Sequence, residues 1–208
     1  MSGQSGDEAA KPKRDPLKLA LWGVAGIGVA AVVYIIAQAS QNPQQASDLK
    51  KLARGEMSKL TFPAEATVPP ANSFVDASGA PVRIADFQGQ VAVVNLWATW
   101  CAPCVIEMPT LAKLAASYEG KPVKVVTISI DRPADEEKAR AFIAKHAPLA
   151  FYHDPKMALP FAFTPPAAGM PTTVIYGADG RERARLSGDA DWSSAEAKAV
   201  IDKVLAGG

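Results

Sequence analysis

The chain has 208 residues, of which 49% are hydrophobic and 21% charged, a balance typical of a globular protein rather than a disordered one. Its 22 basic and 21 acidic residues leave a net charge of +1, so we expect no nucleic-acid partner. Its two cysteines are too few for a disulfide-stapled mini-fold or for a zinc site made of four thiolates within one chain.

The N-terminal region has the pattern of a membrane anchor. The first 18 residues are polar and mixed in charge, which predicts a cytoplasmic tail, and residues 19–37 carry no charge. A helix of that length, at about 1.5 Å per residue, nearly crosses a ~30 Å hydrocarbon core. Basic residues lie just before it and the next charge is Asp48. The positive-inside rule therefore predicts a transmembrane anchor over residues 19–39, with the rest exported.

A cleaved signal peptide is the competing interpretation, because Ala37-Gln38-Ala39 matches a small-residue cleavage site. An uncharged stretch of 19 residues exceeds the usual ~7–15 residues of a signal peptide's apolar region, which favours uncleaved anchoring. A buried helix of a soluble protein is disfavoured because the flanks contain no elements for it to pack inside. Either export interpretation places residues 40–208 outside the cytoplasm.

Residues 40–72 are predicted to form a linker with one short helix, and residues 73–208 the main domain. The linker is Gln-rich over 40–48, has a partial helical period over 49–60, and is Pro-rich and extended over 61–72. The main domain is predicted to contain a hairpin of 74–75 with 82–84, strands at 91–97, 123–130, 172–176 and 183–186, and helices at 101–118, 134–146 and 194–205. This order, a βαβ unit followed by ββα, predicts an α/β fold with a mixed central sheet and helices on both faces.

A Cys-x-x-Cys pair lies where a predicted buried strand meets a helix. Cys101 and Cys104 would face the same side of the first helical turn, where they can form a disulfide. The free N–H groups and positive dipole end of a helix N-terminus favour a thiolate, which is the nucleophilic form of cysteine. Redox chemistry is favoured, while a structural disulfide and half of a shared metal site remain alternatives.

The run VVNLWATWCAPCVIEMP (residues 93–109), with Gly169-Met170-Pro171-Thr172-Thr173 and Asp179-Gly180 downstream, resembles membrane-anchored thioredoxin-like thiol–disulfide reductases of the TlpA type. This group includes ResA and the cytochrome c maturation thioredoxins. The resemblance covers about residues 49–208 and implies a thioredoxin-like fold.

The resemblance also implies roles for individual residues. Cys101 would attack a substrate disulfide, and Cys104 would resolve the mixed disulfide. Pro171 would be a cis-proline facing the cysteines, where it helps exclude metals. The backbone of Met170 would pair with the substrate chain, and Trp100 would shield the site beside Cys101.

Glu107 matches an acidic residue found under the active site in this group and could accept the proton of Cys104. The alternative is an ordinary carboxylate favoured by the helix dipole. Cytoplasmic thioredoxins place a buried Asp six residues before the first cysteine, but this chain has Asn95 there, which cannot take a proton. Asn95 could equally be a buried amide with its hydrogen bonds made.

Several other polar and aromatic residues are assigned structural roles. His146 and His153 are predicted to be surface or capping residues rather than ligands. Four aromatic residues are predicted to be core: Phe151, Tyr152, Phe161 and Phe163. Residues 159–169 form a loop that could line the substrate groove. Arg181, Arg183 and Arg185 alternate along a strand and are predicted to lie on a solvated face.

These observations predict a periplasmic, membrane-tethered protein-disulfide reductase that needs no cofactor and no metal ion. The resemblance implies a membrane electron donor of the DsbD/CcdA type, and oxidised cysteine-containing periplasmic substrates in cytochrome oxidase or cytochrome c biogenesis. A disulfide-forming oxidase and a copper-binding assembly chaperone are the alternatives. A peroxidase is disfavoured because on this fold peroxidases use a lone cysteine before the helix.

Overall fold

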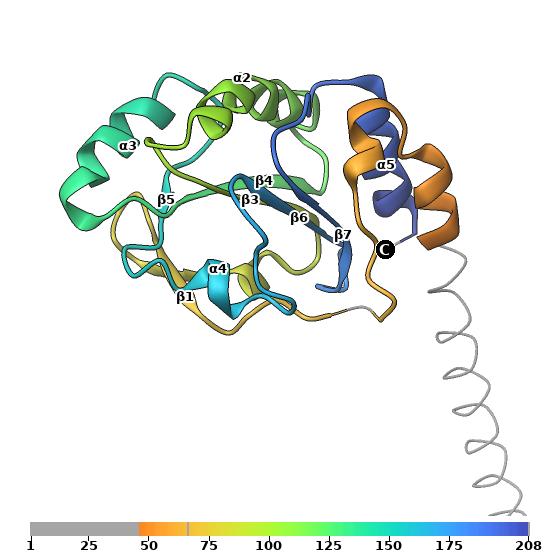
Figure 1. The fold of residues 1–208 in the computed structure, drawn as a ribbon, viewed down its shortest axis with the longest axis horizontal. Coiled ribbons are helices and arrows are strands. Elements are labelled where there is room, and N and C mark those ends of the chain that lie inside the picture. Colours follow the sequence, from red (N-terminus) through yellow and green to blue (C-terminus); the bar gives the residue numbers. More distant parts are fainter. Residues whose placement is uncertain (1–45, 66, 208) are drawn as a thin grey trace, which may run out of the picture. The chain divides into compact units, whose positions relative to one another are not determined.

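The computed structural model describes residues 46–65 and 67–207 (Figure 1). These belong to one compact unit, which spans Asn42–Gly208. The predicted tail and the predicted membrane-spanning segment, residues 1–39, lie outside the described residues. Within the described ranges no helix is both long enough and apolar enough to cross a membrane.

The core of the fold is a seven-stranded mixed sheet in the order β2-β1-β5-β4-β3-β6-β7. Its strands are β1 (Ser73–Asp76), β2 (Pro81–Arg83), β3 (Val91–Trp97), β4 (Val123–Ser129), β5 (Tyr152–His153), β6 (Thr172–Tyr176) and β7 (Glu182–Ser187). The β3–β4 and β4–β5 pairs are parallel and the other pairs antiparallel. All seven residues of β3 are buried, as a Val-rich run without alternation predicts for a central strand.

Beyond residue 52, four helices and three 3₁₀ turns lie in the described part of the chain. The helices are α2 (Ala102–Ser117), α3 (Glu136–Ile143), α4 (Leu159–Ala162) and α5 (Ala195–Ala206), and the 3₁₀ turns are η1 (Gly55–Lys59), η2 (Ile84–Phe87) and η3 (Pro133–Asp135). Figure 1 shows α2 and α4 on opposite sides of the strands. Both α2 and α5 begin at a capping side chain: Cys101 accepts the N–H of Cys104, and Ser194 accepts that of Ala197. The predicted α/β fold with a mixed sheet is confirmed.

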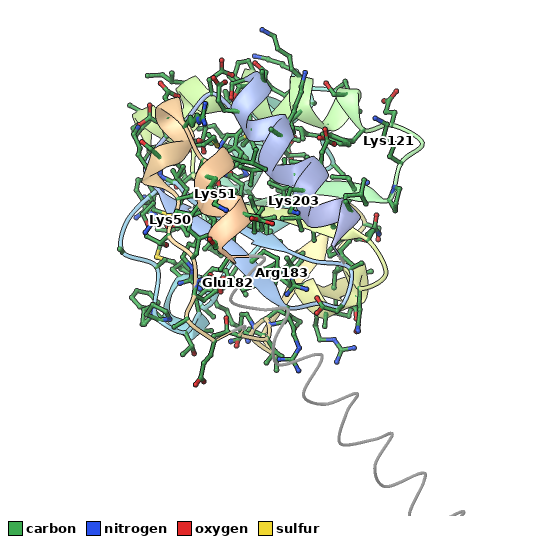
Figure 2. The ribbon with its side chains drawn as sticks, turned by 90° about the vertical axis from the view of Figure 1, so that its right-hand side faces the viewer. Lys50, Lys51, Lys121, Glu182, Arg183 and Lys203 are labelled. Atoms are coloured by element: carbon green, nitrogen blue, oxygen red, sulfur yellow. A yellow bond between two sulfur atoms is a disulfide. The ribbon has the colours of Figure 1, made fainter. Side chains whose placement is uncertain are left out.

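The segment before β1 packs against the rest of the domain. Residues 46–52 are helical, and η1 follows after a break at Gly55, whose φ of +57° suits glycine. The prediction of one helix over 49–60 is therefore wrong. Leu49, Met57 and Leu60 are buried in the core. Figures 1 and 2 show this segment beside α5, and Lys203 of α5 forms a 3.3 Å ion pair with Asp48.

Part of the Pro-rich stretch that follows lies along an edge of the sheet. Thr61 exchanges two backbone hydrogen bonds with Arg185 of β7, and the N–H of Glu182 donates to the carbonyl of Thr67. An uncovered edge strand would present unpaired N–H and C=O groups to other chains, so this cover protects β7.

Several sequence predictions were wrong because they depended on contacts between distant segments. β5 and α4 were not predicted, since strands and helices this short carry almost no periodicity. Phe161 on α4 is 74% exposed rather than core. Arg183 and Arg185, predicted to be solvated, are buried and paired with Asp179 and Glu182 at 2.8 Å.

Candidate active site

The two cysteines form a disulfide at the start of α2. The Cα atoms of Cys101 and Cys104 are 5.3 Å apart. Cys101 is the N-cap of the helix, and its sulfur accepts the backbone N–H of Cys104 at 3.3 Å. Cys101 is 6% exposed and Cys104 is fully buried, so of the two residues only Cys101 keeps any exposure to solvent. This geometry suits Cys101 as the attacking sulfur, because the helix N-terminus stabilises its thiolate.

A buried carboxylate anchors the loop that leads to Cys101. Asp131, just after β4, is 0% exposed and accepts the backbone N–H of Thr99 at 3.0 Å and its hydroxyl at 2.7 Å. Ser129 donates a further hydrogen bond to Asp131 at 2.9 Å. Because β3 and β4 are parallel, their carboxyl ends meet at one edge of the sheet. That topology brings Asp131 to the loop, and sequence analysis did not predict it.

Glu107 lies one turn after Cys104 on α2 and is only 2% exposed. Its carboxylate accepts hydrogen bonds from Asn95 Nδ2 at 2.8 Å, Trp192 Nε1 at 3.1 Å and the N–H of Ala190 at 3.3 Å. Burial raises the pKa of Glu107 to about 7, against the opposing effect of these hydrogen bonds. Glu107 is therefore not an ordinary helix-dipole carboxylate at the surface, and a group with this pKa can exchange a proton near neutral pH.

Asn95 is a buried amide that links two elements of the site. Besides Glu107, its Nδ2 donates to the hydroxyl of Thr173 on β6 at 2.9 Å. Its Oδ1 has no hydrogen-bond partner among the described residues. Asn95 thus donates both amide hydrogens and orients the Glu107 carboxylate, which agrees with the prediction that it is not itself the acid.

Pro171 precedes β6, and the Met170–Pro171 peptide bond is cis. Thr172 is paired with Leu96 near the end of β3, so the proline lies at the edge of the sheet from which the Cys101 loop leaves. Met170 is half-buried against the core, and Trp100 is 57% exposed. These positions bring all six predicted site residues to one end of the molecule. Their individual roles remain predictions.

The two histidines occupy different environments. His146 follows α3, and its Nδ1 lies 2.9 Å from the carbonyl oxygen of Phe142, as predicted for a capping residue. His153 on β5 is fully buried rather than at the surface, and its Nε2 lies 2.8 Å from the carbonyl oxygen of Asp131. No cluster of three or more potential metal-ligating His, Cys, Asp or Glu side chains occurs over residues 46–65 and 67–207.

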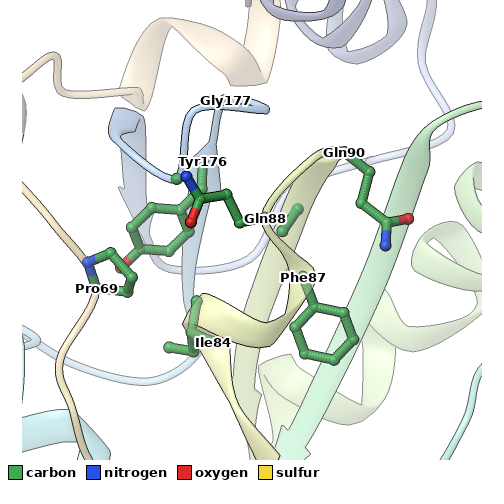
Figure 3. Close-up of a pocket in the computed structure, with 9 residues that line it drawn as sticks. Pro69, Ile84, Phe87, Gln88, Gln90, Tyr176 and Gly177 are labelled. Carbon is green, nitrogen blue, oxygen red and sulfur yellow. The ribbon is translucent and has the colours of Figure 1, made fainter.

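A small apolar pocket lies at the opposite end of β3 from the cysteines (Figure 3). It is lined by residues that include Pro69, Ile84, Phe87 and Tyr176. Gln90 and Ala92 at the start of β3 also line it, and seven strand residues at ~3.3 Å each separate that end from the Cys101 loop. Its lining holds no cysteine, carboxylate or histidine, so the pocket adds nothing to thiol chemistry.

A family model described as Redoxin matches residues 63–201, most of the chain. The chain therefore belongs to the Redoxin family. It is 44% identical over 50 residues to the thiol-disulfide oxidoreductase ResA of Oceanobacillus iheyensis, a match that covers 24% of this chain and 26% of that protein. It is 26% identical over 117 residues to ResA of Bacillus cereus, covering 55% and 64%. The matched regions thus span 26% of the length of the first relative and 64% of the length of the second, less than two thirds in both cases.

Among solved structures, this Redoxin-family chain is similar to a candidate thiol:disulfide interchange protein DsbE from Chlorobium tepidum. The two are 25% identical with a TM-score of 0.58, covering 71% of this chain and 99% of that one. The fold is thioredoxin-like, and the relatives and structural neighbours support a protein similar to the TlpA/ResA type. Together with the Cys101–Cys104 pair, they support a thiol–disulfide oxidoreductase.

Proposed function

We propose that this chain is a protein-disulfide reductase that is tethered to the inner membrane and works in the periplasm. The observation that carries the proposal is the unequal placement of the two sulfurs. Cys101 caps α2 and keeps a small exposure to solvent, while Cys104 is fully buried. One sulfur is thus placed to attack a partner and the other to resolve the product.

In the proposed reaction, the reduced protein starts as a Cys101 thiolate and a Cys104 thiol. The thiolate attacks one sulfur of a substrate disulfide, the substrate S–S bond breaks, and the leaving sulfur departs as a thiolate. Cys104 then gives its proton to Glu107 and attacks the sulfur of Cys101. The mixed disulfide breaks, the second substrate cysteine leaves as a thiolate, and the Cys101–Cys104 disulfide forms. Two electrons pass to the substrate.

The buried network around Glu107 supports its role in this reaction. A buried thiol ionises unfavourably, so a nearby proton acceptor lowers the cost of resolution. Glu107 lies three residues after Cys104 on the same face of α2, and its pKa of about 7 suits exchange of a proton at neutral pH. Asn95 and Trp192 hold its oxygens in place from β3 and from the loop before α5.

The residues between the cysteines favour the reducing direction. Strong oxidants over-stabilise the reduced thiolate. Ala102 and Pro103 carry no charged or hydrogen-bonding side chain that could do so, and the Pro103 nitrogen has no hydrogen to donate. The electron balance then requires a donor that reduces the disulfide after each turnover.

The cellular setting of the proposal comes from the sequence and the relatives. The uncharged segment at residues 19–37 would hold the domain at the membrane, raising its effective concentration near membrane-bound partners. We propose oxidised cysteine-containing proteins of cytochrome oxidase or cytochrome c biogenesis as substrates. The electron donor would be a membrane protein of the DsbD/CcdA type.

The deciding experiment measures the reduction potential of the Cys101–Cys104 couple by equilibration with glutathione buffers. A potential near or below about −220 mV is expected for a reductase. A potential near about −120 mV would assign a disulfide-forming oxidase instead. The absence of any redox transition would overturn both and leave a structural or copper-binding role for the pair.

A further inference from the structure

A groove of approximately 440 Å³ opens beside the residue that precedes Cys101. It is lined by Thr99, Trp100, Arg132, Asp135, Lys138 and Met157, and we call it the Trp100 groove. Its walls come from the β3–α2 loop, from the connection between β4 and α3 together with the first turn of α3, and from the turn before α4. A polypeptide whose disulfide reaches the sulfur of Cys101 must pass over the neighbouring surface, so the groove can receive residues that flank that disulfide.

The charged side chains of the groove are predominantly basic. Arg132 is 80% exposed along its side chain, and its guanidinium lies 3.5 Å from the Asp135 carboxylate. The ammonium group of Lys138 has no ion-pair or hydrogen-bond partner in the described part of the chain. Two carboxylates precede Lys138 on α3, but neither lines the groove, and that of Glu136 is paired with Arg140 at 2.8 Å. One positive charge is therefore left over in the groove.

An apolar contact surface adjoins these cations. Trp100 is 57% exposed, and Met157 lines the same groove. The φ of Met157 is +49°, a backbone conformation that favours glycine. Two hydrogen bonds hold the turn that contains Met157. The N–H of Met157 donates to the carbonyl of Asp154 at 3.0 Å, and the buried Asp154 carboxylate accepts the N–H of Leu159 at 2.8 Å. Aromatic, methionine and arginine side chains are enriched at protein–protein interfaces.

We propose that the Trp100 groove docks the substrate segment next to the target disulfide and selects segments that carry an acidic side chain. Arg132 and Lys138 would attract the carboxylate, and Trp100 and Met157 would pack on the backbone and apolar groups beside it. The proposal rests on the proposed reductase function and specifies the chemistry of its substrate. The net charge of the whole chain is only +1, so the preference would come from this groove and not from a general positive field.

The test uses the reduced full-length protein and three synthetic peptides. Each peptide has one intramolecular disulfide, and they differ only in carrying Glu, Gln or Lys beside the cysteines. Peptide reduction is followed by acid quenching, thiol alkylation and mass spectrometry. The Glu peptide is expected to react roughly tenfold faster than the Lys peptide at low ionic strength, with the difference shrinking as salt is added. Lys138→Glu should remove or reverse this order.

Lys50→Glu is the matched control, because it makes the same charge change at an exposed position of the helix at residues 46–52 (Figure 2). In Figure 1 that helix and α3 lie at opposite ends of the domain. Equal rates for the three peptides with the wild-type protein would overturn the groove proposal and leave the reductase function standing. Failure to reduce any peptide would overturn the reductase function and the groove proposal with it. An equal effect of Lys50→Glu and Lys138→Glu would show a bulk charge effect and overturn the groove proposal.

Discussion

The Nδ2 of Asn95 donates a 2.8 Å hydrogen bond to the carboxylate of Glu107, across the interface between β3 and α2. The carboxyl group that cytoplasmic thioredoxins carry on the strand is thus replaced by an amide, and the acid stands on the helix three residues after Cys104. Asn95 cannot titrate, so the proton chemistry of this buried pair belongs to Glu107.

The pKa of Glu107 predicts a pH dependence of stability. Burial raises this pKa from its ordinary value of 4.5 to about 7, so the folded state holds a proton that the unfolded state releases above pH 4.5. Stability should therefore fall as pH rises from about 4.5 to 7, by on the order of 3 kcal/mol from this group. Urea unfolding of the oxidised protein at a series of pH values measures this loss.

Glu107→Gln is the matched variant for that measurement, because glutamine keeps the shape of the side chain without titrating. It should flatten the pH dependence of unfolding across the same window. An unchanged slope in the variant would show that another group causes the loss and that the pKa of Glu107 is close to normal.

Replacement of each cysteine should have a different result. Cys104→Ser is expected to accumulate mixed disulfides through Cys101, because the attacking sulfur remains and the resolving sulfur is gone. Cys101→Ser should abolish disulfide reduction, since Cys104 is fully buried. Non-reducing electrophoresis with mass spectrometry identifies the trapped species. Reduction of insulin by Cys101→Ser would contradict the proposed order of attack.

The hydrogen bonds between Asp131 and Thr99 predict that Asp131→Asn weakens the active-site loop. The amide places a donor where the carboxylate accepts the N–H and hydroxyl of Thr99 and the hydroxyl of Ser129. A loss of about 1–3 kcal/mol in unfolding free energy is expected, together with slower disulfide exchange. Thr99→Ser keeps the hydroxyl and should behave nearly as the wild type. Equal losses in both variants would argue against anchoring by the hydroxyl.

The buried ion pair of Arg185 and Glu182 should matter more than its exposed counterparts. Both side chains are less than a tenth exposed, and Glu182 also accepts a hydrogen bond from Thr67 at 2.8 Å. Arg185→Met leaves a buried carboxylate without its cation and should cost about 3–5 kcal/mol of unfolding free energy. Arg83→Met breaks an exposed pair with Asp86 and should cost about 0–1 kcal/mol. Similar losses for the two variants would show that burial does not set the strength of the inner pair.

The amino-acid sequence predicted an element correctly where the pattern that indicates it lies within a few neighbouring residues. The strands at 91–97 and 172–176 were predicted with the bounds that the structure has, because a continuous apolar run and a Pro start are readable within a few residues. The helices that follow Cys101 and Ser194 were readable for the same reason. The Cys-x-x-Cys pair needed only its spacing and its place between strand and helix.

Only the tertiary structure decided which side chains meet. Arg185 alternates with Arg183 along β7. Alternation shows that the two share a face but not whether other groups cover that face, and here the Phe163 ring and the Glu182 carboxylate contact Arg185. Asp131 reaches Thr99 only because β3 and β4 are parallel neighbours, and Trp192 reaches Glu107 from 85 residues away. Periodicity reports the environment of neighbouring residues, whereas these contacts depend on how distant segments pack, which sets the burial, the pKa and the partners of each group.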